Sequence, residues 1–289
     1  MPSTRDIRRR IRSVKNTAQI TKAMQMVAAA KMRKAQQMAL AGRPYATLMN
    51  EVLGEVSAAS GEFQDALMEK REVKKRALIL VSSDKGLCGA LNSNVLREAA
   101  KLDRNTTVYI TAGRKAAQFI ARTKRELSAE FTYKDAPLFA EARAISKFAR
   151  DLFLKGEVDQ VDILYTSFIS TLNQKPETIP FLPVQEVKGV GDNVHQEEQL
   201  KTGTAEFLFE PGQREVFGTL LPHYLNYRVY QVLLEAKASE QSARMVAMKN
   251  ATDNAKQIIK DLTLEYNKLR QANITKELLE ITSAAMAMN

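Results

Sequence analysis

Residues 82–92 come closest, in residue type and spacing, to a site of chemistry in this chain. They overlap the end of a predicted strand, 77–83, and contain Gly86 and Gly89. In an open α/β sheet, the loop after the first strand is where a phosphate would bind. The spacing, however, matches neither G-x-x-x-x-G-K-[ST] nor G-x-G-x-x-G. We therefore interpret Gly86 and Gly89 as residues of a structural turn with helix capping.

A few other residues could act as nucleophiles, bases or metal ligands. Ser82 and Lys85 have the spacing of an S-x-x-K nucleophile motif, but the companion motifs of that enzyme class are absent. Cys88, the single cysteine, could be a nucleophile, although a small buried residue in a tight turn is the commoner role. His195 and His223 lie near no cysteine or acid at metal-ligand spacing. We therefore expect no catalytic, cofactor-binding or metal-binding residues.

The first 34 residues account for most of the net positive charge. The net charge of the chain is +10, and this segment contributes +9, from ten basic residues and one acid. Such a segment could bind nucleic acid, an anionic membrane face or an acidic protein surface, and it has features of a transit peptide. No aromatic residue precedes Tyr45, which disfavours stacking on bases. The helical pattern continues past residue 34, which disfavours a cleaved leader.

The elements that must position these residues are indicated by glycine and proline. All twelve glycines, and every proline except Pro2, lie between Gly42 and Pro222. Both residue types are unfavourable inside helices, so we predict long terminal helices around a turn-rich middle. The longest apolar runs have the length of strands, so no membrane span is predicted. One cysteine allows no internal disulfide and indicates a reducing, intracellular setting.

Both terminal helices have apolar seams. In the N-terminal helix the steps alternate between 4 and 3, at Ile7, Ile11, Val14, Ala18, Thr21, Gln25, Ala28, Met32 and Ala35. A second apolar stripe consists of Ile20, Met24 and Val27, so this helix should touch more than one neighbour. The C-terminal seam includes Val229, Val232, Leu233, Ala236, Ser239, Ala243, Val246, Ala247, Ala251, Ile258, Leu262, Leu269, Leu278 and Ile281. We expect the two helices to pair as an antiparallel coiled coil.

The C-terminal helix should extend past its partner. A helix of about 75 residues is roughly 110 Å long, whereas one of about 55 residues reaches roughly 80 Å. Its tip, residues 281–289, is apolar and almost uncharged. Alone in water such a tip would fray, so a surrounding partner is expected.

Residues 75–210 alternate strand and helix signals. Strands are predicted at 77–83, 107–111, 128–133, 161–168 and 179–187, and helices at 91–102, 114–124 and 138–154. The prolines of 179–187 restrict it to an edge strand or extended segment, and the polar residues 188–203 should form an exposed loop. The predicted fold class is α/β plus a long antiparallel α-helical coiled coil, with a central Rossmann-like, mostly parallel sheet. The predicted domains are 1–60, 75–210 and 211–289.

Three blocks of sequence resemble the gamma subunit family of F-type ATP synthases. They are residues 19–34 (QITKAMQMVAAAKMRK), residues 83–92 (SDKGLCGALN) and residues 238–281, which include ASEQSARM, ATDN and RQANITKELLEI. The blocks follow the family's order, and the last is close to a signature. Ala90 and Ala284 stand where the family commonly has glycine.

The resemblance implies a non-catalytic rotor shaft without cofactors, which couples rotation of a membrane ring to ATP synthesis or hydrolysis in a ring of three alpha and three beta subunits. It implies contacts with these head subunits at Lys22, Met24, Arg244, Gln271 and Thr275. It implies contacts of a foot with the membrane c-ring, beside the epsilon subunit, at Arg43, Tyr45, Phe209 and Glu210. No nucleic acid and no small-molecule substrate is implied. Met1 directly before the helix suggests a bacterial form, peripheral on the cytoplasmic face of the membrane.

Several alternatives stay open. The coupling ion could be a proton or sodium. A coiled-coil nucleic-acid-binding protein would use the basic arm, by which we mean residues 1–34, and its binding would weaken steeply with salt. An enzyme using the central domain would require a bound nucleotide at residues 83–92.

Overall fold

The computed structural model describes residues 3–59, 65–184, 210 and 212–287. The chain divides into two compact units. The helical unit consists of Met1–Ala28 and Arg244–Asn289, and the α/β unit consists of Ala29–Ala243. Each of the two long helices, α1 (Thr4–Ala41) and α6 (Gln213–Ala287), contributes one part to each unit. The predicted fold class, long terminal helices with a mostly parallel central sheet, is confirmed.

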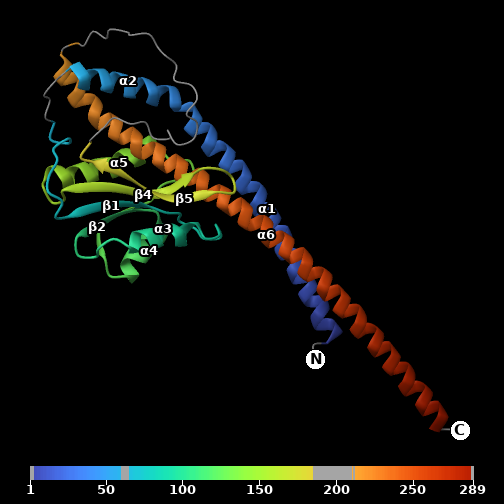
Figure 1. The fold of residues 1–289 in the computed structure, drawn as a ribbon. Coiled ribbons are helices and arrows are strands. Elements are labelled where there is room, and N and C mark those ends of the chain that lie inside the picture. The colour runs from blue at the N-terminus through green and yellow to red at the C-terminus, as the bar shows by residue number, and fades with distance from the viewer. Residues whose placement is uncertain (1–2, 60–64, 185–209, 211, 288–289) are drawn as a thin grey trace. The chain divides into compact units, whose positions relative to one another are not determined.

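In the helical unit, α1 and α6 lie side by side and run antiparallel (Figure 1). The Arg8 guanidinium donates a hydrogen bond to the Tyr266 hydroxyl at 2.6 Å, and the Thr21 and Thr252 hydroxyls are 2.7 Å apart. Higher numbers on α1 therefore match lower numbers on α6. The predicted α1 seam is confirmed, because its members in this unit are buried or half-buried: Ile7, Ile11, Val14, Ala18, Thr21, Gln25 and Ala28.

Thr21, a polar interruption in the predicted seam, is paired across the coiled coil. Its hydroxyl and that of Thr252 are both buried. Each also lies within hydrogen-bond distance of a carbonyl oxygen of its own helix, Ala18 at 3.1 Å and Met248 at 2.8 Å. Two hydroxyl protons can therefore make one bond between the helices and one within a helix. A buried polar pair of this kind specifies the register of a coiled coil.

The predicted α6 seam is wrong at Ile258, whose side chain is 44% exposed. Ile259, which is half-buried, takes the seam position between Ala255 and Leu262, because the steps of 4 and 3 run through it. Leu278 and Ile281 are also exposed. The pairing of Arg8 with Tyr266 brings the start of α1 close to residue 270, so later α6 residues have no facing helix in the described part of the unit.

The predicted N-terminal helix is interrupted in the structure. A turn at Gly42 separates α1 from α2 (Arg43–Ala59). Pro44 lies in the first turn of α2, where a missing N–H is tolerated, and its nitrogen cannot donate to a carbonyl of α1, so it favours a break between the two helices. The Tyr227 hydroxyl donates to the Gly42 carbonyl at 2.5 Å. α2 then packs in the α/β unit, where its Met49 and Leu53 are buried.

The sheet has the order β3-β2-β1-β4-β5. Its strands are β1 (Arg76–Val81), β2 (Thr107–Ala112), β3 (Glu126–Phe131), β4 (Gln160–Phe168) and β5 (Gln174–Leu182). The first four are parallel, and β5 pairs antiparallel with β4 at the edge. The remaining helices are α3 (Leu91–Ala100), α4 (Arg114–Arg122) and α5 (Phe139–Leu154).

Two hydrophobic cores cover the two faces of the sheet. In β1, Ile79 points into the larger core with α2, α5 and α6, whereas Leu78 and Leu80 point into the smaller core with α3 and α4. Because both faces are covered, β1 is a continuous apolar run rather than an alternating one. Figure 1 shows α5 and the α3–α4 pair on opposite sides of the sheet.

The predicted edge strand at 179–187 begins earlier than expected. The amides of Ser170 and Asn173 donate to each other's carbonyl oxygens at 3.0 and 3.3 Å, and this turn sends the chain back along β4. Pro176 and Pro180 lie within β5, where an edge position tolerates a missing donor. The predicted loop at 188–203 lies outside the described residues.

Candidate functional site

The loop after β1 lies at the carboxyl end of this central strand. It fills the place where a phosphate would bind in a nucleotide-binding fold. The first backbone N–H groups of α4 donate to this loop. Arg114 N donates to Asp84 Oδ1 at 3.0 Å, and Ala116 N donates to Ser82 Oγ at 2.8 Å. Between them, Lys115 N donates to the Ser83 carbonyl at 3.2 Å. The N-terminus of α4 is therefore occupied by a carboxylate and two oxygens of the chain itself.

The rest of this loop is held by its own side chains. Ser83 Oγ donates to the Lys85 carbonyl at 2.7 Å, and Asn92 Nδ2 donates to Ser83 Oγ at 2.8 Å. Cys88 is buried, and its Sγ lies 3.2 Å from Asn92 Nδ2. Gly89 has φ +59°, whereas Gly86 has no unusual φ. The turn roles of these two glycines stay predictions. The sequence did not indicate that the capped helix is α4, about 30 residues further on.

The histidines and acids form no metal cluster in the described residues. His223 lies in α6 beside aromatic rings, with centroids 6.0 Å from Tyr45 and 5.4 Å from Phe139. His195 lies outside the described residues. None of the described helices combines the length and apolarity needed to cross a membrane.

The basic arm presents its charges to solvent in the helical unit. All of its lysines and arginines are exposed there: Arg5, Arg8, Arg9, Arg10, Arg12, Lys15 and Lys22. Apolar side chains lie among them, since Ile20, Met26 and Val27 are 60%, 58% and 54% exposed. The second apolar stripe therefore has no cover within the described chain at Ile20 and Val27. Met26 extends that exposed surface and was not singled out from the sequence.

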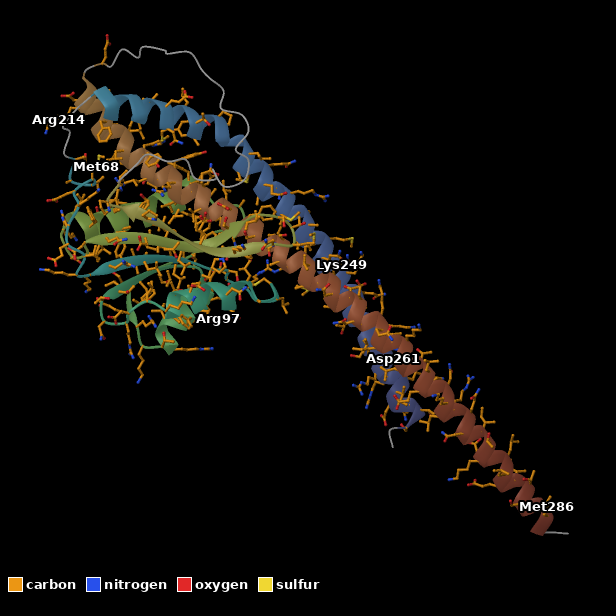
Figure 2. The ribbon with its side chains drawn as sticks, in the orientation of Figure 1. Met68, Arg97, Arg214, Lys249, Asp261 and Met286 are labelled. Carbon is orange, nitrogen blue, oxygen red and sulfur yellow. The ribbon has the colours of Figure 1, made fainter. Side chains whose placement is uncertain are left out.

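The residues predicted to contact head subunits all lie in the helical unit. Lys22, Gln271 and Thr275 are exposed, and Met24 and Arg244 are half-buried. Figure 2 shows the polar side chains of this stretch of α6, including Lys249 and Asp261, projecting away from the helix axis. The contacts of these five residues with head subunits stay predictions.

The residues predicted for the foot are only partly described. Tyr45 is 45% exposed, and its ring lies edge-on to Tyr227, with centroids 5.1 Å apart. Glu210 is exposed, and the side chain of Arg43 is not described. Phe209 lies outside the described residues. Whether these side chains form one surface therefore stays a prediction.

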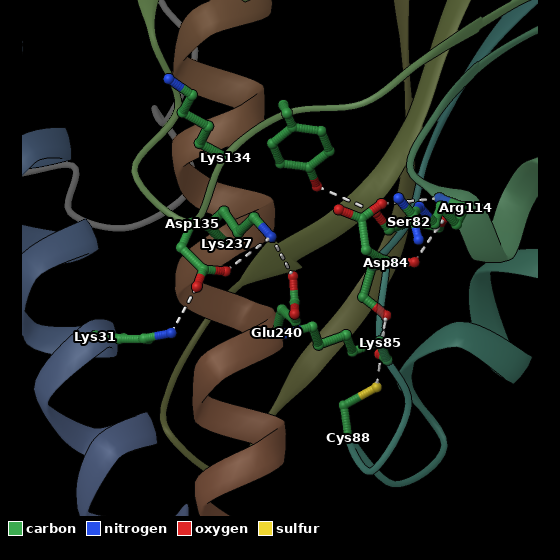
Figure 3. Close-up of polar contacts among 12 residues, drawn as sticks. Lys31, Ser82, Asp84, Lys85, Cys88, Arg114, Lys134, Asp135, Lys237 and Glu240 are labelled. Atoms are coloured by element: carbon green, nitrogen blue, oxygen red, sulfur yellow. Dashed lines mark hydrogen bonds and ion pairs between the residues drawn. The ribbon is translucent and has the colours of Figure 1, made fainter.

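Two carboxylates and a lysine in the part of α6 that belongs to the α/β unit are buried or half-buried there, and the sequence analysis missed them. Lys237 is 2% exposed and pairs with Glu240 at 2.9 Å (Figure 3). Its ammonium also lies 4.7 Å from the centroid of the Tyr133 ring. A lysine among the small residues 236–239 of a buried seam is the signal that could have found it.

Glu235 anchors the same helix to the β4–β5 hairpin. Its carboxylate accepts hydrogen bonds from Ser167 Oγ at 2.8 Å, Phe168 N at 2.9 Å and the Tyr165 hydroxyl at 3.2 Å. Burial raises the pKa of this carboxyl above its ordinary value, although the hydrogen bonds oppose that shift, and the nearby charge of Glu177 adds to it. The folded state therefore binds this proton more tightly than the unfolded state does.

At pH 8 the Glu235→Gln variant is expected to be more stable than the parent by on the order of 1 kcal/mol. Its free energy of unfolding should also depend less on pH. Since the pKa is raised, the stability from Glu235 is complete below its unfolded pKa and decreases as the pH rises through its folded pKa. The amide oxygen can still accept from Ser167 and Phe168, and its NH2 can donate to Tyr165.

The measurement is urea unfolding of the full chain between pH 5 and 8. Glu235→Ala is the contrast, because it leaves buried donors unpaired and should cost about 1–3 kcal/mol at every pH. A pH dependence of Glu235→Gln that equals the parent's would contradict the assignment.

Fold and site together define a protein with long, antiparallel terminal helices and an α/β domain whose phosphate position is filled by its own side chains. The ATP synthase family model matches residues 3–288. The ATP synthase gamma chains of Opitutus terrae and Roseiflexus castenholzii are 49% and 47% identical to the chain, which spans 99% of each of them. These matches cover 99% and 100% of this chain. The chain belongs to the ATP synthase gamma chain family.

Solved structures agree with this assignment. A chain in the central stalk and c-ring structure of the Tetrahymena thermophila mitochondrial ATP synthase is 27% identical, with a TM-score of 0.61 over 80% of this chain and 99% of that one. A chain in the Euglena gracilis mitochondrial ATP synthase has a TM-score of 0.68 at 20% identity, over 99% of this chain and 94% of that one. The second likeness supports the fold.

Proposed function

We propose that this chain is the central rotor shaft of an F-type ATP synthase and is not itself catalytic. The observation that carries the proposal is family membership over the full length of a chain whose terminal helices pair antiparallel. Rotation of the shaft couples a membrane ring to conformational cycling of a catalytic ring of alpha and beta subunits. The nucleotides bind to those subunits.

The helical unit is proposed to turn inside the catalytic ring. Several apolar side chains near the end of α6 support this, since they are exposed in the chain alone: Ile274, Leu278, Leu279, Ile281 and Met286. Water is an unfavourable environment for such a stretch, so a surrounding sleeve of subunits would stabilise it. A tip without fixed ion pairs to the sleeve would also turn with little resistance.

Contacts with the head are proposed at Lys22, Met24, Arg244, Gln271 and Thr275, five residues that are exposed or half-buried in the helical unit. The exposed basic arm would face an acidic surface of a beta subunit, and steering by opposite charge would speed assembly. The exposed apolar neighbours Ile20 and Val27 would supply buried contact area at the same surface.

Contacts with the membrane ring, beside an epsilon subunit, are proposed at Arg43, Tyr45, Phe209 and Glu210. The described support is the exposure of Tyr45 and Glu210. On this proposal the chain is peripheral, on the cytoplasmic face of a bacterial membrane, and takes part in ion transport through its partners.

Reconstitution with purified alpha and beta subunits from the same source tests the proposal. We expect one copy of the chain in a complex with three of each subunit, together with multi-site ATP hydrolysis that is absent without the chain. Amides of residues 274–286 should gain protection from hydrogen exchange on assembly.

The outcome against the proposal is a chain that stays free while hydrolysis is the same with and without it. If the chain then binds nucleic acid, and this binding falls steeply between about 50 and 200 mM salt, the alternative function of the basic arm in nucleic-acid binding would be favoured.

A further inference from the structure

The side chain of Asp135 joins two helices that are far apart in sequence. Asp135 lies in the loop between β3 and α5, and its carboxylate accepts a hydrogen bond from Lys31 of α1 at 2.5 Å. Its other oxygen lies 3.6 Å from the ammonium of Lys237 of α6. Figure 3 shows the carboxylate between the two lysines. All three residues belong to the α/β unit.

The α6 end of this bridge is held in place by surrounding groups. The buried Lys237 also pairs with Glu240, which is 5% exposed, and lies over the ring of Tyr133. The Tyr133 hydroxyl in turn donates to the carbonyl of Ser82, directly after β1, at 3.1 Å. Lys237 is therefore a fixed cation that connects α6 to the sheet, and Asp135 is attached to it.

The α1 end of the bridge lies near one end of the α1 segment in this unit. At the other end of that segment, the carbonyl of Gly42, the residue that follows α1, accepts a hydrogen bond from Tyr227 of α6. Lys31 and Gly42 are separated by about 16 Å along the helix, at 1.5 Å per residue. Polar contacts at both ends would resist rotation of the segment about its own axis better than one contact.

We propose that Asp135 is a positioning residue for torque transmission, which fixes α1 on α6 by bridging Lys31 and Lys237. This inference rests on the proposed rotor function. A single exposed ion pair would be too weak for such a task. Here the carboxylate has a second, buried cation beside it, and the pKa of Asp135 is lowered by the hydrogen bond from Lys31 and by the charge of Lys237.

The test variant is Asp135→Asn, which keeps the shape of the side chain and removes its charge. Lys237 keeps its pair with Glu240, so the chain should still fold. The matched control is Glu126→Gln. The Glu126 carboxylate pairs with Lys75 at 3.1 Å and is 55% exposed, against 54% for Asp135, but it bridges no helices.

Two readouts are made on the whole synthase in lipid vesicles. In Asp135→Asn, amides of α1 at 31–41 should exchange about fivefold faster, and the ratio of ion transport to ATP hydrolysis should fall while hydrolysis persists. Glu126→Gln should change neither. Lys31→Met should have the same effect as Asp135→Asn, and the variant with both changes should be no worse than either. Asp135→Glu, which keeps the charge, should keep the parent values.

The inference fails if Asp135→Asn behaves like Glu126→Gln while the parent chain assembles and couples normally. A parent chain that neither assembles nor activates hydrolysis would instead sink the rotor function. The two failures are therefore distinguishable.

Discussion

Replacing Lys237 by methionine is expected to lower the free energy of unfolding of the full chain by about 3–5 kcal/mol. The ammonium is 2.9 Å from Glu240, and both side chains are almost fully buried, at 2% and 5% exposed. Methionine fills a similar volume but leaves the Glu240 carboxylate without this cation in a site of low dielectric constant. The Tyr133 ring and Asp135 lose the same charge.

The control for this prediction is Lys101→Met. Lys101 pairs with Glu98 at 2.8 Å, also three residues apart on the chain, but the two side chains are 65% and 40% exposed. Exposed pairs contribute little, so the loss should stay below about 1 kcal/mol. Urea unfolding followed by circular dichroism measures both variants. Equal losses would show that burial of the Lys237 pair has no energetic weight.

Gly113→Ala should destabilise the chain by about 3–5 kcal/mol, because two costs add. Gly113 has φ +110° and ψ 143°, a backbone conformation that side-chain-bearing residues avoid. A Cβ there would also collide with the Ser82 carbonyl, whose carbon would be 2.8 Å away. The neighbouring backbone is fixed, since Gly113 N donates to the Phe131 carbonyl at 2.9 Å. The clash therefore has no easy relief.

Gly156→Ala is the contrast, because it has a positive φ without the clash. Gly156 has φ +73°, but no atom lies within 4 Å of a Cβ placed there. Only the backbone cost of about 1–2 kcal/mol is expected. Thermal and urea unfolding of both variants provide the comparison. If Gly113→Ala cost no more than Gly156→Ala, the close approach of Ser82 to the α4 N-terminus would be wrong.

The Gly113 prediction also concerns the filled phosphate position. Ser82, Ser83 and Asp84 reach the first N–H groups of α4 only because the backbone at Gly113 passes close to the end of β1. Loosening that approach would free the N-terminus of α4 to interact with water or an anion. The loss of stability is therefore expected to be accompanied by faster hydrogen exchange at Arg114 and Ala116.

The sequence alone was enough for features that depend on local spacing. The α1 seam was predicted residue by residue, because a heptad repeat follows from helix geometry and needs no knowledge of the partner. The order of strands and helices in the middle was predicted for the same reason, since buried parallel strands are continuous apolar runs. The edge position of β5 followed from its prolines, because a missing donor is tolerated at an edge.

Other features depend on which distant residues meet, and these required the tertiary structure. Thr21 faces Thr252, and Lys31 faces Asp135, across more than 100 residues in each case. No local pattern marks such a pair, because each of these residue types is common in helices or loops. The α6 seam passes through Ile259 rather than Ile258, since its phase is set by the helix that it faces. The N–H groups at the start of α4 donate to oxygens of the loop after β1, about 30 residues earlier in the chain, and only the tertiary fold brings these groups together.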